Sequence, residues 1–152
     1  MKNFFSLRRE FMQRFDIAIP AQPCCEPDTL AMWETMLEEE LLEFREALHA
    51  FKNMPSDQPD ERHRRMAELT AEGVDVLNVL TGLLLSQGMP VEAMAEEIHA
   101  ANLRKCVNGQ IVRRADGKVL KPEGWQPANK QRIIQEAQQA GDEMVSANPR
   151  HD

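Results

Sequence analysis

Aromatic residues and glycine are scarce in this 152-residue sequence, which has no tyrosine, two tryptophans, six phenylalanines and seven glycines. Alanine, leucine, glutamate, methionine, arginine and glutamine dominate instead, and these residues favour helix. The hydrophobic fraction is an ordinary 42%, and a chain of this length can bury a core of its own. We therefore expect one mainly helical domain over residues 1–152.

Cysteine is also rare, and the charge is not basic. The three cysteines, Cys24, Cys25 and Cys106, cannot pair evenly, and two adjacent cysteines do not have the spacing of a zinc site. Free thiols in a reducing compartment are the simplest explanation. The net charge of −7 argues against binding to a nucleic acid polymer, which needs a basic face. A nucleotide substrate stays open, because a bound divalent cation can reverse the local charge.

Long apolar runs are missing as well. We find no segment with the roughly 18 consecutive apolar residues of a membrane-spanning helix. The N-terminus carries Arg8 and Arg9 but no apolar stretch followed by a small-residue cleavage site. The sequence therefore predicts a cytoplasmic protein with no membrane partner.

Five segments show the helical spacing of apolar residues. The clearest is about 29–52, with Asp28 as a plausible N-cap. The others are expected at about 3–15, 60–87, 90–106 and 128–146. Asp116-Gly117 is typical of a hairpin turn, and the tail at about 147–152 is expected to be disordered. The prediction is an all-α bundle of four or five helices with a short hairpin-like segment near the C-terminus.

Acidic residues interrupt the most apolar segment of the chain, 71–85. Glu72 and Asp75 lie three residues apart among valines and leucines, and a carboxylate in apolar surroundings needs a cation or another partner. The preceding predicted helix carries a second pair, Glu40 and Glu43, which share one helix face beside the apolar seam. If the two helices pack side by side, four carboxylates converge.

Four converging carboxylates cannot all stay ionised without a cation between them. Hard oxygen ligands select Mg²⁺, with Mn²⁺ as a possible substitute, and such ions bind phosphate oxygens and activate water. Two other interpretations stay open at this point. The acids could form a solvated helix face. A di-iron centre would need two Glu-x-x-His motifs, and only one occurs, from Glu96 to His99.

The pattern Glu40-x-x-Glu43, followed after 28 residues by Glu72-x-x-Asp75, resembles that of the MazG-type all-α nucleoside triphosphate pyrophosphohydrolases. The stretch from Glu96 to Pro127 strengthens the resemblance. It has His, Asn and Lys on a predicted helix, then a Gly-Lys turn, a lysine, an aromatic residue and a proline. This order is similar to that of the phosphoribosyl-ATP pyrophosphohydrolase-like group, which includes dimeric dUTPase-like members.

The resemblance implies a role for each matching residue. The four paired acids would hold Mg²⁺, and Glu39 would help to bind the metal or orient the attacking water, so that Glu39 and Glu40 are the candidate catalytic residues. Asn102, Lys105, Lys118 and Lys121 match positions near the nucleotide, although the last two could be plain solvated charges. Two further candidates come from the sequence itself: Asn78 for the nucleotide pocket or a local bond, and Trp125 for stacking on the base, where packing is favoured.

The expected reaction is hydrolysis of a nucleoside triphosphate between the α and β phosphates, which gives the monophosphate and pyrophosphate. By resemblance, the substrate is of the house-cleaning or dUTP type. Hydrolysis of phosphoribosyl-ATP is the alternative reaction, and a non-catalytic helical interaction module is the alternative from another class. Met32 and Leu42 lie off the main apolar seam of their predicted helix, and this placement predicts a homodimer or a higher homo-oligomer.

Overall fold

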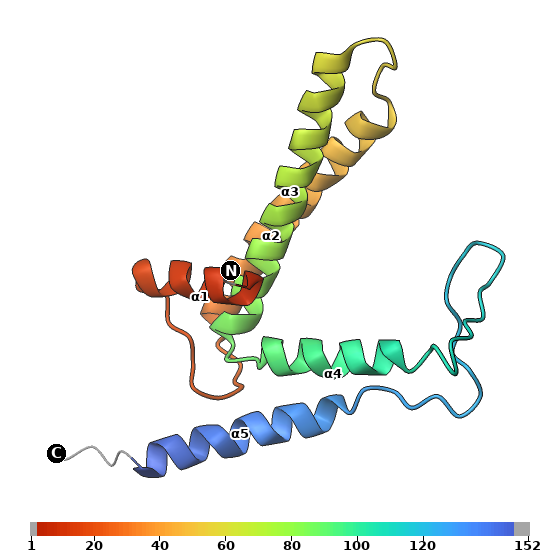
Figure 1. Ribbon diagram of the computed structural model, residues 1–152. Helices are drawn as coiled ribbons and strands as arrows, with labels where there is room; N and C mark the ends of the chain where they lie inside the picture. The colour runs from red at the N-terminus through yellow and green to blue at the C-terminus, as the bar shows by residue number, and fades with distance from the viewer. Residues whose placement is uncertain (1–2, 148–152) are drawn as a thin grey trace. The chain divides into compact units, whose positions relative to one another are not determined.

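The computed structural model describes residues 3–147, and all regular structure in that range is helical (Figure 1). The helices are α1 (Phe4–Arg14), α2 (Pro27–Lys52), α3 (Pro59–Ser86), α4 (Val91–Leu103) and α5 (Lys130–Ala147). The predicted all-α class and its five helical segments are confirmed. The tail that was expected to be disordered lies, from residue 148 onward, outside the described residues.

The chain divides into two compact units, one up to Met89 and one from Pro90 onward, and each is described by itself. The first unit holds α1, α2 and α3, and the second holds α4 and α5. A single domain over the whole chain stays a prediction.

In the first unit, α2 and α3 lie side by side as an antiparallel pair, and α1 packs against α3 (Figure 1). Both long helices begin at a proline, Pro27 or Pro59, whose fixed φ suits the first helical position. The prediction of Asp28 as an N-cap is wrong, because α2 begins one residue before it. Asp28 lies instead in the first turn, where a negative charge interacts favourably with the helix dipole.

Trp33 is the centre of the first unit. Its side chain is 2% exposed, and Met12 of α1 and Leu85 of α3 are fully buried. Opposite the indole ring, α3 presents a glycine. A Cβ atom at Gly82 would lie 2.4 Å from a ring carbon of Trp33, so no larger residue fits there without movement. This close approach fixes the spacing of α2 and α3 at the end of the pair where α1 packs.

The proline-containing segment between α1 and α2 is held by hydrogen bonds at its C-terminal end, just before α2. The side chain of Gln87, which directly follows α3, is buried, and its Oε1 accepts a hydrogen bond from the backbone N–H of Glu26 at 2.7 Å. The carbonyl of Gln87 accepts a second one, from the backbone N–H of Cys24 at 3.0 Å. One residue of α3's C-terminal end therefore sets where α2 begins.

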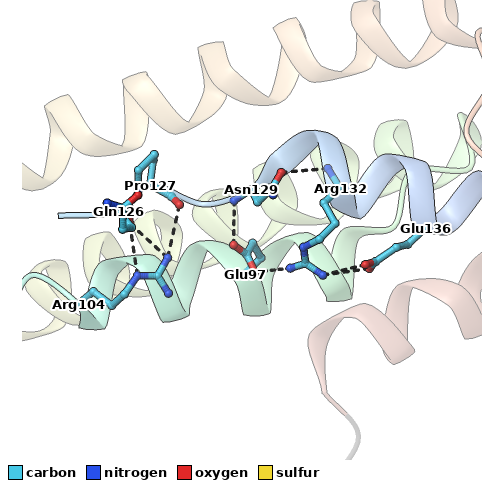
Figure 2. A network of polar contacts seen from close by, with 7 residues as sticks. All are labelled: Glu97, Arg104, Gln126, Pro127, Asn129, Arg132 and Glu136. Atoms are coloured by element: carbon cyan, nitrogen blue, oxygen red, sulfur yellow. Dashed lines mark hydrogen bonds and ion pairs between the residues drawn. The ribbon is translucent and has the colours of Figure 1, made fainter. Parts of the chain in front are cut away.

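In the second unit, α4 and α5 are joined by a polar network (Figure 2). The carboxylate of Glu97 on α4 accepts a hydrogen bond from the backbone N–H of Asn129 and pairs with Arg132 of α5, both at 2.8 Å. Asn129 in turn caps α5, because its side chain accepts from the backbone N–H of Arg132 at 3.2 Å. Arg132 also pairs with Glu136 at 2.9 Å.

The connection from α4 to α5 is irregular. Arg104 donates two hydrogen bonds to the carbonyl of Gln126, at 3.2 and 3.3 Å (Figure 2), which brings the two ends of the connection together. The hairpin prediction is confirmed as a tight turn with isolated bridges rather than strands. Arg114 N–H donates to the carbonyl of Lys118, and Gly117 has a φ of +88°, which suits glycine.

Among the described residues, α3 is the one helix that is long and apolar enough, by length and composition alone, to cross a bilayer. The core helix of a soluble protein meets the same criterion, and the apolar part of α3 carries Glu72 and Asp75. The expectation of no membrane partner stays a prediction.

Candidate metal centre

Three carboxylates from two helices converge in the first unit. One oxygen each of Glu40 and Glu43 on α2 and of Glu72 on α3 can be chosen so that all three lie within 4.8 Å of one another. Glu40 and Glu72 are half-buried and Glu43 is exposed. The i, i+3 spacing on α2 and the side-by-side packing of α2 and α3 together produce the cluster. The predicted convergence therefore occurs for these three residues.

The fourth predicted ligand, Asp75, lies at the edge of this cluster. Its charge raises the pKa of both Glu40 and Glu72, but it is exposed and is not one of the three converging carboxylates. Asn78, one turn further along α3, donates a long hydrogen bond of 3.3 Å to Asp75 Oδ1. Asn78 thus makes the local bond that was one of its two predicted roles.

The electrostatics of the cluster are unfavourable when no cation is present. Burial raises the pKa of Glu40, and the negative charges of Asp75, Glu43 and Glu72 raise it further. Burial, followed by the charges of Glu43 and Asp75, raises the pKa of Glu72. None of the three clustered carboxylates has a basic ion-pair partner within residues 3–147. This donor set fits a hard divalent cation, which would neutralise the mutual repulsion.

Neither Glu39 nor the Glu96–His99 motif belongs to the converging group. Glu39 is exposed next to the cluster, and its charge contributes to the raised pKa of Glu40, but it is not one of the converging residues. Glu96 and His99 are both exposed on α4. The converging group in the described part of the chain contains no histidine, so the Glu96–His99 motif is not part of this cluster, and the identity of the metal stays a prediction.

A cavity of about 290 Å³ opens between α2 and α3 beside the cluster. Two of the clustered acids, Glu43 and Glu72, line it. The rest of its lining was not predicted from the sequence and consists of Glu46, Ala47, Ala50, Arg64, Arg65 and Glu68. Glu61 hydrogen-bonds to Arg64 and then to Arg65, and these contacts lower its pKa to about 2. These ion pairs could have been predicted from the sequence, because Glu61 precedes the two arginines by three and four residues, the spacing at which side chains on a helix meet.

The predicted substrate-binding residues after α3 lie in the second unit, where four of them gather. Lys105 Nζ donates to Asn102 Oδ1 at 2.8 Å. The ammonium groups of Lys105 and Lys121 lie 5.7 and 4.7 Å from the centre of the Trp125 ring. Trp125 itself is fixed by a hydrogen bond from its Nε1 to the carbonyl of Ala101 at 2.7 Å. This packed position is the one favoured for Trp125 from the sequence.

Lys118 is the exception in this second group. Its side chain is exposed, and its backbone N–H donates to Asp116 within the turn. That these second-unit residues bind the same substrate as the acids stays a prediction.

Comparison with known proteins bears on the first unit and α4. No curated protein matches the chain. The family model described as phosphoribosyl-ATP pyrophosphohydrolase matches residues 8–102, which is more than half of the sequence. The match includes Asn78, Asn102 and the five acids predicted to bind metal or water: Glu39, Glu40, Glu43, Glu72 and Asp75. Lys105, Lys118, Lys121 and Trp125 lie beyond the matched residues. The chain therefore belongs to the phosphoribosyl-ATP pyrophosphohydrolase family, and with it to the MazG-like all-α pyrophosphatase superfamily.

Proposed function

We propose that this protein is a Mg²⁺-dependent nucleoside triphosphate pyrophosphohydrolase that cleaves between the α and β phosphates. The observation that carries the proposal is the convergence of Glu40, Glu43 and Glu72 without a basic partner. Mg²⁺, or Mn²⁺ in its place, would bind phosphate oxygens there and offset the charge that develops on them during displacement. Family membership supports the same reaction class.

The chain's own side chains supply the remaining steps. Glu40, Glu43 and Glu72, with Asp75 at the edge, would hold the metal ion, which would supply the binding site for the phosphate oxygens. Glu39 is exposed beside them and accepts the proton of the attacking water.

A house-cleaning or dUTP-type nucleotide is the proposed substrate. Phosphoribosyl-ATP is the second candidate, because the matching family carries that activity in its description. In both candidates the bond to be broken lies between the α and β phosphates. Phosphoribosyl-ATP differs by the phosphoribosyl group attached to its base. A panel of triphosphates and phosphoribosyl-ATP, incubated with Mg²⁺ and assayed for pyrophosphate, separates them.

Site variants test the assignment. Glu72→Gln keeps the size of the side chain but removes the charge. We expect it to lose pyrophosphate release at least a hundredfold, because a metal ligand is lost. Glu34→Gln is the matched control, since Glu34 is exposed on the same helix as Glu40. If Glu72→Gln stays folded and retains full activity, the metal site lies elsewhere.

We also propose that the first unit forms a homodimer through its exposed apolar side chains. On α3, Met66, Val74 and Leu77 are 39%, 42% and 49% exposed, and on α2, Met32 and Leu42 are 51% and 57% exposed. Large apolar side chains that are this exposed on both helices favour an interface with another chain. Light scattering gives the mass in solution. A monomer that also lacks pyrophosphatase activity and Mg²⁺-induced stabilisation would favour the interaction module.

A further inference from the structure

Arg8 of α1 has an unusual environment for a charged side chain. Its guanidinium carbon lies 4.3 Å from the centre of the Phe11 ring and 5.3 Å from that of Trp33. Its Nε is buried without a hydrogen-bond partner, and the buried Nε1 of Trp33 lacks one too. No acidic side chain pairs with Arg8 within the described range, 3–147. Buried donor atoms without acceptors indicate a missing partner.

Helix register relates this position to the metal centre. Trp33 precedes Glu40 by seven residues on α2, and Gly82 follows Asp75 by seven on α3. Seven residues are nearly two turns, so each pair shares a helix face and is separated by about 10 Å along the axis. Arg8 belongs to the Trp33 and Gly82 end, because its Nε would lie 3.1 Å from a Cβ atom at position 82.

That separation matches the length of a nucleotide. With the phosphates at the acids, the sugar lies in the region of Asn78, one turn beyond Asp75 on α3. The edge of the base farthest from the sugar then reaches the end of the helix pair where Arg8 lies. Phe11, whose ring lies against the guanidinium of Arg8, is 39% exposed, so part of the surroundings of Arg8 faces solvent.

The chemistry of the unpaired groups restricts the base. A guanidinium has N–H donors and no acceptor, and an indole nitrogen is a donor only. Such a site satisfies a keto oxygen but leaves an amino group facing another donor, and an unpaired buried polar group is costly. The preference therefore falls on keto bases (uracil, thymine, hypoxanthine and guanine) over cytosine and adenine.

We propose that Arg8 is a specificity-determining residue that donates a hydrogen bond to a keto oxygen at the base edge farthest from the sugar. This inference rests on the proposed triphosphate hydrolysis and names the class of its substrate. Asn78 and the acids contact the sugar and phosphates that all nucleotides share, whereas Arg8 contacts the part that differs between them.

Two matched pairs of substrates test the proposal. dUTP and dCTP differ in the keto or amino group at position 4 of the ring, and dITP and dATP differ at position 6. For the unmodified protein, we expect kcat/KM to be about 10- to 100-fold higher for the keto member of at least one pair, the usual value of a hydrogen bond to a charged donor. Arg8→Gln should bring that ratio close to one, because an amide can turn either a donor or an acceptor toward the base.

Control variants separate recognition from packing. Arg14→Gln, on the exposed side of α1, should leave the keto preference unchanged. Arg8→Lys still has N–H donors and no acceptor, so this variant should still prefer the keto member of each pair. If Arg8→Gln does not fold, the keto-to-amino ratio of kcat/KM is compared between the unmodified protein and Arg8→Lys instead. A ratio near one in both would overturn the proposal. A uniform loss for all four substrates in Arg8→Gln would overturn the proposal in favour of a packing role or a contact with a second copy.

Different results would exclude the proposed function and the role of Arg8. If the unmodified protein releases pyrophosphate from none of these four triphosphates and from no other member of the nucleotide panel, the proposed function is wrong. If it hydrolyses them but neither pair shows a keto preference, the function stands and the role of Arg8 is wrong.

Discussion

The glycine opposite Trp33 offers a quantitative test of the packing that positions the candidate site. Replacement of a helix-interior glycine by alanine stabilises an exposed site by about 1 kcal/mol, through backbone entropy. At Gly82 the added methyl group would meet two carbons of the Trp33 ring at 2.4 and 2.5 Å. The ring is rigid and 2% exposed, so it cannot move aside into solvent. Such overpacking costs about 1–3 kcal/mol and occasionally more.

With a rigid ring as the neighbour, the upper part of that range applies. We therefore expect Gly82→Ala to be destabilised by about 1–2 kcal/mol after the propensity gain is included. For a chain of this size, that loss corresponds to a fall of roughly 3–8 °C in Tm. Thermal unfolding followed by circular dichroism, with urea unfolding as an independent measure, gives both values.

Gly73 provides the matched control, because it lies on the same helix and a Cβ atom there would have only an ordinary contact of 3.5 Å, with Phe44. Gly73→Ala should therefore raise the stability by up to about 1 kcal/mol. The two substitutions should therefore change the stability in opposite directions. If Gly82→Ala is as stable as Gly73→Ala, α3 does not approach Trp33 as described.

Two further predictions concern charge. Since the raised pKa of Glu40 and Glu72 means that their ionisation opposes folding, the metal-free protein should lose stability as the pH rises through those values. Mg²⁺ should raise Tm more at pH 8 than at pH 5, by differential scanning fluorimetry, and an equal effect at both would contradict a site at these carboxylates. The backbone N–H of Asn129 and then Arg132 lower the pKa of Glu97, so its contribution is present above the ordinary carboxyl pKa and is lost as the pH falls. Glu97→Gln should therefore speed amide hydrogen exchange at the start of α5 at neutral pH but change it little in acid, and unchanged exchange at neutral pH would show that Glu97 does not hold α5.

Local patterns predicted the helices well because apolar spacing and proline positions act within a few residues. The limits of α3, for example, differ from the expected 60–87 by one residue at each end. The fourth helix was expected to reach residue 106 but ends at Leu103. There, the N–H groups of Lys105 and Cys106 bond to carbonyls only three residues back, which closes the helix in a tighter turn. Such terminal bonding leaves no mark in the apolar pattern.

The acidic cluster was predictable because a carboxylate such as Glu72 in an apolar helix is a local anomaly. The environment of Arg8 was not, because Trp33 is 25 residues away in the sequence and meets it only through the packing of α1 on the α2–α3 pair. Likewise, Gly82 is an ordinary small residue in the sequence. Its role depends on which ring lies opposite, and that information is tertiary.

The attachment of Cys24 and Glu26 to Gln87 divides the segment between α1 and α2 into two parts with different tolerance to change. A Cβ atom at Gly88 would lie 2.2 Å from the carbonyl oxygen of Gln22, so the part from Gln22 onward is docked, and an inserted residue there would shift the start of α2. Ala18, in the earlier part, is exposed. It is the position at which a fluorescent label or a short insertion should be accepted without moving the helices.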